Sequence, residues 1–205
     1  NGTPLNKAIA GNLTIDSGSS FDMEYVGGAA GGGLTIAGNV VNNGTFTLGN
    51  ADGDDLIVGG SWTRTGTFNP NSRRVTFNGS SGQTITGTTI FDYLTLNNST
   101  GLTLQTSSAI TVNQTLGLAS GKIIIGANNL TIGSSGTITG YNSSNYIVTA
   151  SSGKLIKQGV GNTATVFPVG FSNSNYTPIT LTNTTGTSDL SVSVKQSVSN
   201  AVSDA

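Results

Sequence analysis

Short apolar triplets alternate with short polar segments along most of the chain. In each triplet two apolar residues flank a Thr or similar residue, as in Leu94-Thr95-Leu96. Residues i and i+2 of a strand share one face, so Leu94 and Leu96 point to one side and Thr95 points to the other. The pattern therefore predicts short strands that each bury one face.

The triplets recur with a fixed period near 22. Leu94, Leu116 and Ile138 are evenly spaced at this period, and each interval holds three triplets. Leu34 and Leu56 are separated by the same interval. Asn, Ser and Gly fill the segments between triplets, and Gly and Asn tolerate the backbone conformations of sharp corners. Three strands and three corners in each period are typical of a β-solenoid.

We therefore predict an all-β fold, a triangular parallel β-helix with one strand on each side of every coil. Leu34 follows Leu13 at nearly the same interval, which extends the period to the N-terminal part of the chain and gives about seven coils between Leu13 and Lys157. Neighbouring coils would stack at roughly 4.8 Å. A right-handed coil is expected, because parallel crossover connections are right-handed.

The outward Thr residues of the triplets could form regular ladders on a flat face, as in ice-binding solenoids. The period breaks such an array, because it stacks Thr95 on Gly117, Thr103 on Ile124 and Thr131 on Ile156. The Thr residues are therefore explained by their preference for strands and by solubility.

The pattern changes after Lys157. Residues 176–181 and 190–194 alternate over longer stretches, with ordinary loops between them. We predict a solenoid domain over residues 1–157 and a second unit over residues 158–205. This second unit is either a β cap that packs on the last coil or the start of a β-sandwich, since a few strands with unpaired edges are unfavourable alone.

The composition of the chain excludes several classes of function. Charged residues make up 8% of the 205 residues and the net charge is −1, which gives no electrostatic basis for binding nucleic acid or an anionic membrane. No apolar run reaches the length of a membrane span. Cys and His are absent, which excludes disulfides, thiol nucleophiles and histidine bases. These features favour a non-enzymatic extracellular protein.

The triplets and two later motifs together resemble a known class of protein. Repeated Leu-Thr-Leu blocks are followed by Phe-Pro-Val-Gly and Tyr-Thr-Pro-Ile-Thr-Leu, over residues 91–104, 121–132, 146–161 and 167–181. This arrangement is similar to the repetitive β-solenoid regions of large secreted, adhesin-like surface proteins of Bacteroidota. The resemblance implies a cell-surface location and export by the type IX system. It carries no catalytic motif onto these positions.

Asp52, Asp54 and Asp55 form a small acidic cluster, Asp52-Gly53-Asp54-Asp55. Carboxylate oxygens at neighbouring positions are ligands that Ca²⁺ prefers, so these residues are a candidate calcium site. A full EF-hand loop would need a Glu at its twelfth position, where this chain has Thr63. The alternative is an exposed corner whose carboxylates accept hydrogen bonds from backbone amides.

Two arginines follow this cluster at close to one coil's distance. Arg73 and Arg74 come slightly less than one period after Asp54 and Asp55, so stacked coils would bring the two pairs together. Acidic calcium ligands beside a basic residue occur in β-helix lyases that act on uronates, and a calcium-dependent polysaccharide lyase is therefore one hypothesis. The alternative is a surface salt bridge between coils, which contributes about 0–1 kcal/mol.

Tyr141 is the aromatic residue best placed to contact a sugar, because it lies in a predicted corner. Trp62, by contrast, falls at a triplet position and is expected in the core. Tyr141 is thus a candidate glycan-binding residue, with polysaccharide or host and cell-surface glycans as its partners.

The sequence favours an extracellular structural or adhesive segment of a larger bacterial surface protein, without enzymatic activity or a required cofactor. A polysaccharide-binding module and a calcium-dependent polysaccharide lyase are the two alternatives. The open end of a solenoid can pair with another strand. End-to-end self-association, or contact with flanking domains of the same long protein, is therefore expected.

Overall fold

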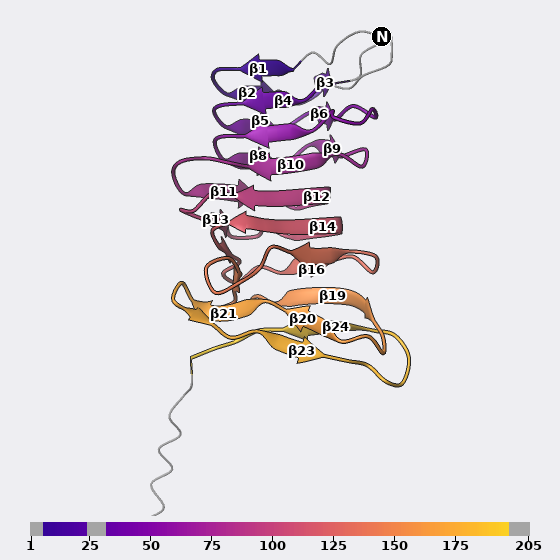
Figure 1. Cartoon of the computed structure of the whole chain (residues 1–205). Coiled ribbons are helices and arrows are strands. Elements are labelled where there is room, and N and C mark those ends of the chain that lie inside the picture. The colour runs from indigo at the N-terminus through magenta and orange to yellow at the C-terminus, as the bar shows by residue number, and fades with distance from the viewer. Residues whose placement is uncertain (1–5, 24–31, 197–205) are drawn as a thin grey trace, which may run out of the picture.

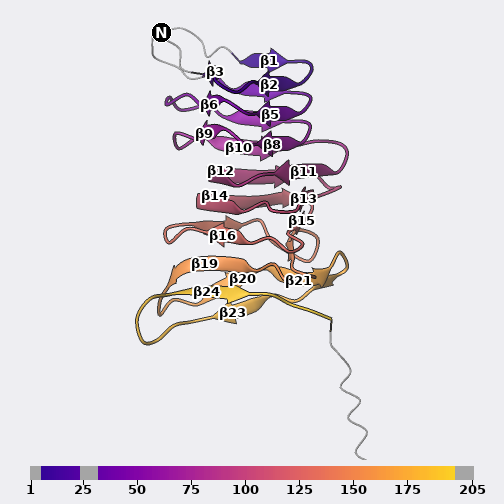
Figure 2. The same ribbon diagram turned by 180° about the vertical axis from the view of Figure 1, so that it is seen from behind.

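A computed structural model describes residues 6–23 and 32–196, and over these ranges the chain is all-β. The strands stack into a column of parallel coils (Figure 1), so the predicted fold class is confirmed. Each coil contributes one strand to each of three faces. The same stack seen from behind shows the second-face strands following one another down the column (Figure 2).

The first face begins each coil. Its strands are β1 (Lys7–Ile9), β4 (Leu34–Ile36), β7 (Leu56–Val58), β10 (Arg74–Phe77), β12 (Thr89–Asn97), β14 (Ile110–Ser120) and β17 (Thr137–Thr139). The second face follows. Its strands are β2 (Leu13–Ile15), β5 (Val40–Asn42), β8 (Trp62–Arg64), β11 (Gln83–Thr86), β13 (Leu102–Leu104), β15 (Ile123–Ile124) and β18 (Ile147–Val148).

The third face is built from separate strands at the N-terminal end of the column and mostly from parts of longer strands further along. Its first three strands are β3 (Ser20–Asp22), β6 (Thr45–Thr47) and β9 (Thr67–Asn69), which form a separate sheet. The N-terminal halves of β12 and β14 then continue this face, followed by β16 (Leu130–Ile132) and β19 (Leu155–Val160). In β12 and β14 the third strand of one coil therefore runs on into the first strand of the next coil.

The register confirms the predicted period. Leu94 lies opposite Leu116, and Leu116 lies opposite Ile138, so these three residues occupy the same position in successive coils. The seven first-face strands are joined by six steps that average about 22 residues, and single steps range from 19 to 27 residues over the described part of the chain. The sequence-based count of about seven coils agrees with this.

The predicted phase of the first coil is wrong. Leu13 and Leu34 do not occupy equivalent positions, because Leu34 lies opposite Lys7 on the first face and Leu13 lies opposite Val40 on the second. The step between these two coils is longer than the period, and the Asn39 N–H donates to the side chain of Asn12, 27 positions earlier. Two identical Leu-Thr-Ile triplets therefore sit on different faces. Relative to the next coil, two of the extra residues lie between β2 and β3, and the other three lie between β3 and β4.

Alternation within β12 decides which side chains enter the core. Phe91 is fully buried, whereas its neighbour Ile90 is 51% exposed. The register of β12 against β14 shifts between Phe91 and Tyr93. In earlier coils a corner occupies this position and separates the third-face strand from the next first-face strand. Phe91, and not Ile90, thus fills the core of this coil.

Aromatic side chains fill the core of the N-terminal half. Trp62 is fully buried, as its triplet position predicts. Its ring centroid lies 4.9 Å from that of Phe68, 5.7 Å from that of Phe91 and 6.2 Å from that of Phe46. Later coils fill the same space with Leu, Ile and Val. The core is therefore continuous along the column.

The C-terminal strands close the column as a cap, one of the two predicted arrangements. They are β20 (Thr165–Phe167), β21 (Val169–Ser172), β22 (Asn175–Tyr176), β23 (Ile179–Leu181) and β24 (Ser188–Val192). β21 pairs parallel with β18, while β24 pairs antiparallel with β19 and ends that sheet. β19 also crosses the predicted domain boundary at residue 157, so solenoid and cap share a strand.

Candidate functional site

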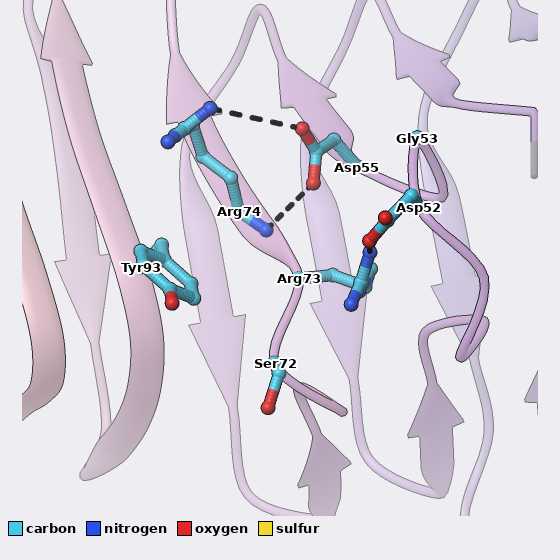
Figure 3. A pocket seen from close by; sticks show the side chains of 7 residues that line it. All are labelled: Asp52, Gly53, Asp55, Ser72, Arg73, Arg74 and Tyr93. Atoms are coloured by element: carbon cyan, nitrogen blue, oxygen red, sulfur yellow. Dashed lines mark hydrogen bonds and ion pairs between the residues drawn. The ribbon is translucent and has the colours of Figure 1, made fainter.

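An open cleft of about 360 Å³ lies at the corner that leads into β7 and β10 (Figure 3). Its lining consists mainly of charged and polar residues from two successive coils, together with one aromatic ring from the next coil. These residues are Asp52, Gly53, Asp55, Ser72, Arg73, Arg74 and Tyr93. The cleft therefore contains two of the three predicted calcium ligands and both predicted arginines.

Asp52 and Arg73 form an ion pair, with 2.8 Å between Asp52 Oδ1 and Arg73 Nη1. The Arg73 side chain is only 15% exposed, because its guanidinium also donates to the carbonyls of Ala51 at 2.9 Å and Asn71 at 3.2 Å. The sequence placed Arg73 one coil after Asp54, and its partner is instead Asp52. The guanidinium is held by the protein on three sides.

Asp55 and Arg74 are brought together as their spacing predicts. Asp55 Oδ1 accepts a hydrogen bond from the Arg74 backbone N–H at 2.8 Å, and Asp55 Oδ2 lies 3.9 Å from Arg74 Nη1. Charge-assisted N–H···O bonds are usually about 2.7–2.9 Å long. The backbone contact is therefore strong, while the contact between the two side chains is loose.

Asp54 does not face the cleft. Its side chain is turned inward and the residue is only 6% exposed. Asp54 Oδ1 accepts a hydrogen bond from the Gly32 N–H at 2.7 Å, and Oδ2 accepts one from the Ala51 N–H at 3.1 Å. A buried carboxylate that caps backbone amides is a structural element of the corner. This is the alternative that the sequence left open for the acidic cluster.

The three carboxylates of the calcium hypothesis thus have three different partners. Asp52 pairs with Arg73, Asp54 caps two amides and Asp55 holds the backbone of Arg74. In residues 6–23 and 32–196, no group of three acidic, His or Cys side chains is placed to hold one metal ion. Calcium binding by Asp52, Asp54 and Asp55 stays a prediction.

The lyase hypothesis required the acidic and basic residues to meet across coils, and they do. The contacts have the form of the alternative interpretation, because they are two ion pairs between neighbouring coils. A lyase base must be free to take a proton from its substrate, and Arg73 already donates to two carbonyls and a carboxylate. In the lyase hypothesis, Arg74 is therefore the arginine that would have to act as the base.

Tyr141 lies far along the column from this cleft. It is half-buried, packs against the core and lines a groove of about 240 Å³ between the last coil and the cap, beside Phe167. Lys157 closes one side of this groove, and its ammonium donates to the carbonyls of Gly133, Ser134 and Gln158 at 2.8 Å each. Burial lowers the pKa of Lys157, and the negative charge of Asp189 partly opposes this. Glycan binding by Tyr141 stays a prediction.

Tyr93 and Ser72 also line the cleft, and the sequence singled out neither of them for this site. Tyr93 lies directly opposite Arg74 in the register, and the Arg74 guanidinium carbon is 5.8 Å from the centre of the Tyr93 ring. The step from Arg74 to Tyr93 equals the step of 19 positions from Asp55 to Arg74. This repeated spacing was the signal that could have found it.

The comparisons with known proteins identify no relative of this chain. No protein-family model, no curated protein and no solved structure matches this chain. None of the elements that the structure describes is a helix with the length and apolar character of a membrane span.

Proposed function

We propose that this chain is a rigid, non-enzymatic segment of a larger bacterial surface protein, which acts outside the cell as a stalk or adhesive spacer. The observation that carries the proposal is the unbroken parallel stacking of seven coils. Successive first-face strands pair from β1 to β17, and a second sheet pairs in parallel from β2 to β21. A column of this kind resists bending because every coil is hydrogen-bonded to its neighbours.

The core supports the same role. The inward positions of the coils hold apolar residues such as Ile36, Val58, Phe77, Leu96 and Leu118, each fully buried. Full burial of one such side chain contributes about 1.5–3 kcal/mol. The stabilisation is spread along the whole length of the column, as a spacer under mechanical load requires.

The composition supports a location outside the cell. Charged residues make up 8% of the chain and the outward strand positions are mostly Thr, so solubility rests on hydroxyl and amide groups. The resemblance to repetitive surface proteins of Bacteroidota favours the same location.

The experiment that tests the spacer role measures the stiffness of the column. Thr35 and Thr139 lie in one outward row of the first face, five coil steps apart, and both are exposed. The chain has no native Cys. Spin labels on a Thr35→Cys/Thr139→Cys variant should give one narrow distance distribution, with the two Cα atoms about 24 Å apart.

The same labelled protein in denaturant supplies the control, because its distribution must become broad. A broad or two-peaked distribution under native conditions would overturn the rigid spacer. Circular dichroism of the labelled variant separates this result from a failure to fold.

A further inference from the structure

One outward row on the first face gathers side chains of unlike chemistry from successive coils. Arg74 lies opposite Tyr93, Tyr93 opposite Thr115, and Thr115 opposite Thr137. Asp55 precedes Arg74 by one coil and is bound to its backbone. The row therefore presents an acid, a guanidinium, an aromatic ring and two hydroxyls in line along the column, one from each coil.

The two neighbouring arginines of the cleft have different roles. Arg73 is 15% exposed, and three oxygen atoms of the protein accept hydrogen bonds from its guanidinium. Arg74 is 49% exposed, and its Nη1 lies 3.9 Å from the nearest carboxylate oxygen of Asp55. Arg73 is thus a structural residue, whereas Arg74 presents N–H donors to the open cleft.

Tyr93 lies within cation–π distance of the Arg74 guanidinium. The ring lies beneath the guanidinium, with 5.8 Å between the guanidinium carbon and the ring centre. Figure 3 shows both side chains on the same side of the cleft. A guanidinium that interacts with an aromatic ring through its face keeps its N–H edge free, and this edge matches the two oxygens of a carboxylate. The pair is therefore prepared to bind a planar anion.

The shape of the cleft favours a polymer over a small molecule. The cleft is open, and the hydroxyl row of Thr115 and Thr137 continues beyond Tyr93 at one-coil spacing. Thr115 Oγ1 and Thr137 Oγ1 lie 3.5 Å apart. A ligand that binds Arg74 through a carboxylate can thus contact further hydroxyl groups along the column, which suits an acidic polysaccharide.

We propose that Arg74, which lies over the ring of Tyr93, binds a carboxylate of a uronate-containing polysaccharide that lies along the first face. The ligand carboxylate takes the place of the loose Asp55 contact, while Asp55 keeps its hydrogen bond to the Arg74 backbone. Thr115 and Thr137 contact sugar hydroxyls further along the row. This site goes beyond the spacer role and lies on another part of the column than Tyr141.

The test is a titration of the full chain with polygalacturonate oligomers and with the same oligomers after reduction of their carboxyl groups. The intact chain should bind the charged oligomer and lose most of this affinity for the reduced one. Arg74→Gln should weaken binding of the charged oligomer about tenfold, the effect of losing one charge-assisted hydrogen-bonded pair. Asp55→Asn should strengthen it, because a competing carboxylate is removed and the backbone acceptor is kept.

Lys122→Gln is the matched control. Lys122 also lies over a tyrosine, with its Nζ 5.2 Å from the centre of the Tyr146 ring, and its loss changes the net charge equally. Binding by this variant should be unchanged. Absent binding by the intact chain, equal binding of the reduced oligomer, or an equal loss in Lys122→Gln would each overturn the proposal. Circular dichroism confirms folding of each variant, and the distance measurement on the column tests the spacer role separately.

Discussion

Arg73 and Asp52 are 21 positions apart in the chain, and their side chains meet at 2.8 Å on neighbouring coils. Asp52 is fully exposed, whereas Arg73 is largely buried. Exposed ion pairs contribute little to stability. The main effect of the contact is therefore to position the Arg73 side chain against the corner. Arg74 is then the arginine that faces solvent.

Removal of the Asp54 carboxylate should destabilise the fold. Asp54→Ala leaves the N–H groups of Gly32 and Ala51 without their acceptor inside the corner. A buried donor that loses its partner costs about 1–3 kcal/mol, so the free energy of unfolding should fall by this amount. Urea denaturation measures it. Asp52→Ala at the exposed tip is the control and should leave stability almost unchanged; equal losses would contradict the structural role of Asp54.

Two glycines with positive φ should respond differently to alanine. Gly121 has φ +91°, and an added Cβ would overlap the carbonyl oxygen of Asn98 in the preceding coil. Gly18 has φ +81°, and an added Cβ there would meet no atom within 4 Å. Gly18→Ala should cost about 1–2 kcal/mol, the strain of a left-handed residue with a side chain.

Gly121→Ala should lower the free energy of unfolding clearly more than Gly18→Ala, because the two coils must move apart to make room for the new Cβ. Thermal unfolding of both variants checks this difference. A similar loss for the two would mean that the coils are spaced more widely at Gly121 than the structure has them.

Neighbouring apolar residues in β12 provide a test of the alternation. Phe91→Ala removes a fully buried ring from the contact with Trp62 and should cost about 3–5 kcal/mol. Ile90→Ala removes a side chain that is 51% exposed and should have a small effect. Trp62 is the only tryptophan of the chain, so its fluorescence follows unfolding in both variants. The reverse order of stabilities would show that β12 is shifted by one residue.

Alkaline pH should weaken the junction between solenoid and cap. Burial raises the pKa of the Tyr146 phenol, and its O–H donates to the Ser172 carbonyl at 2.6 Å. The unfolded phenol has a pKa of about 10, so above this pH the unfolded state releases its proton first. The stability contributed by the neutral phenol is complete below that pH and is lost as the pH rises through the folded-state pKa.

Tyr146→Phe is the variant that isolates this effect. It should be less stable than the parent by about 0.5–1.5 kcal/mol near pH 8, because one hydrogen bond is missing. Its stability should then fall less steeply than that of the parent above pH 10. Urea titrations at several pH values measure both slopes, and parallel slopes would exclude Tyr146 as the titrating group.

The candidate site was only partly predictable. The spacing of Asp55 and Arg74 indicated their contact, and the structure confirms it. The partner of Arg73 was predicted wrongly, because Asp52 and Asp54 are too close in sequence for spacing to separate them. Their roles differ because the corner turns Asp54 inward to cap two amides and turns Asp52 outward.

The sequence by itself determined the repeat. Alternation within triplets decides which side chains can share a face, and a recurring interval decides that coils stack. The predicted stacking of Thr95 on Gly117, Thr103 on Ile124 and Thr131 on Ile156 follows from these two local rules, and the register confirms all three pairs.

Only the tertiary structure decided the phase of each coil and the contacts that depend on it. Residues that stack on one another are separated by as few as 19 positions, at Asp55 and Arg74, and by as many as 27 positions, at Asn12 and Asn39. The residues of a triplet do not indicate on which face the triplet lies, because every face buries the same kind of side chain. The face is decided by the lengths of the corners and by the fit of each coil on its neighbour, and this fit places Tyr93 beneath Arg74.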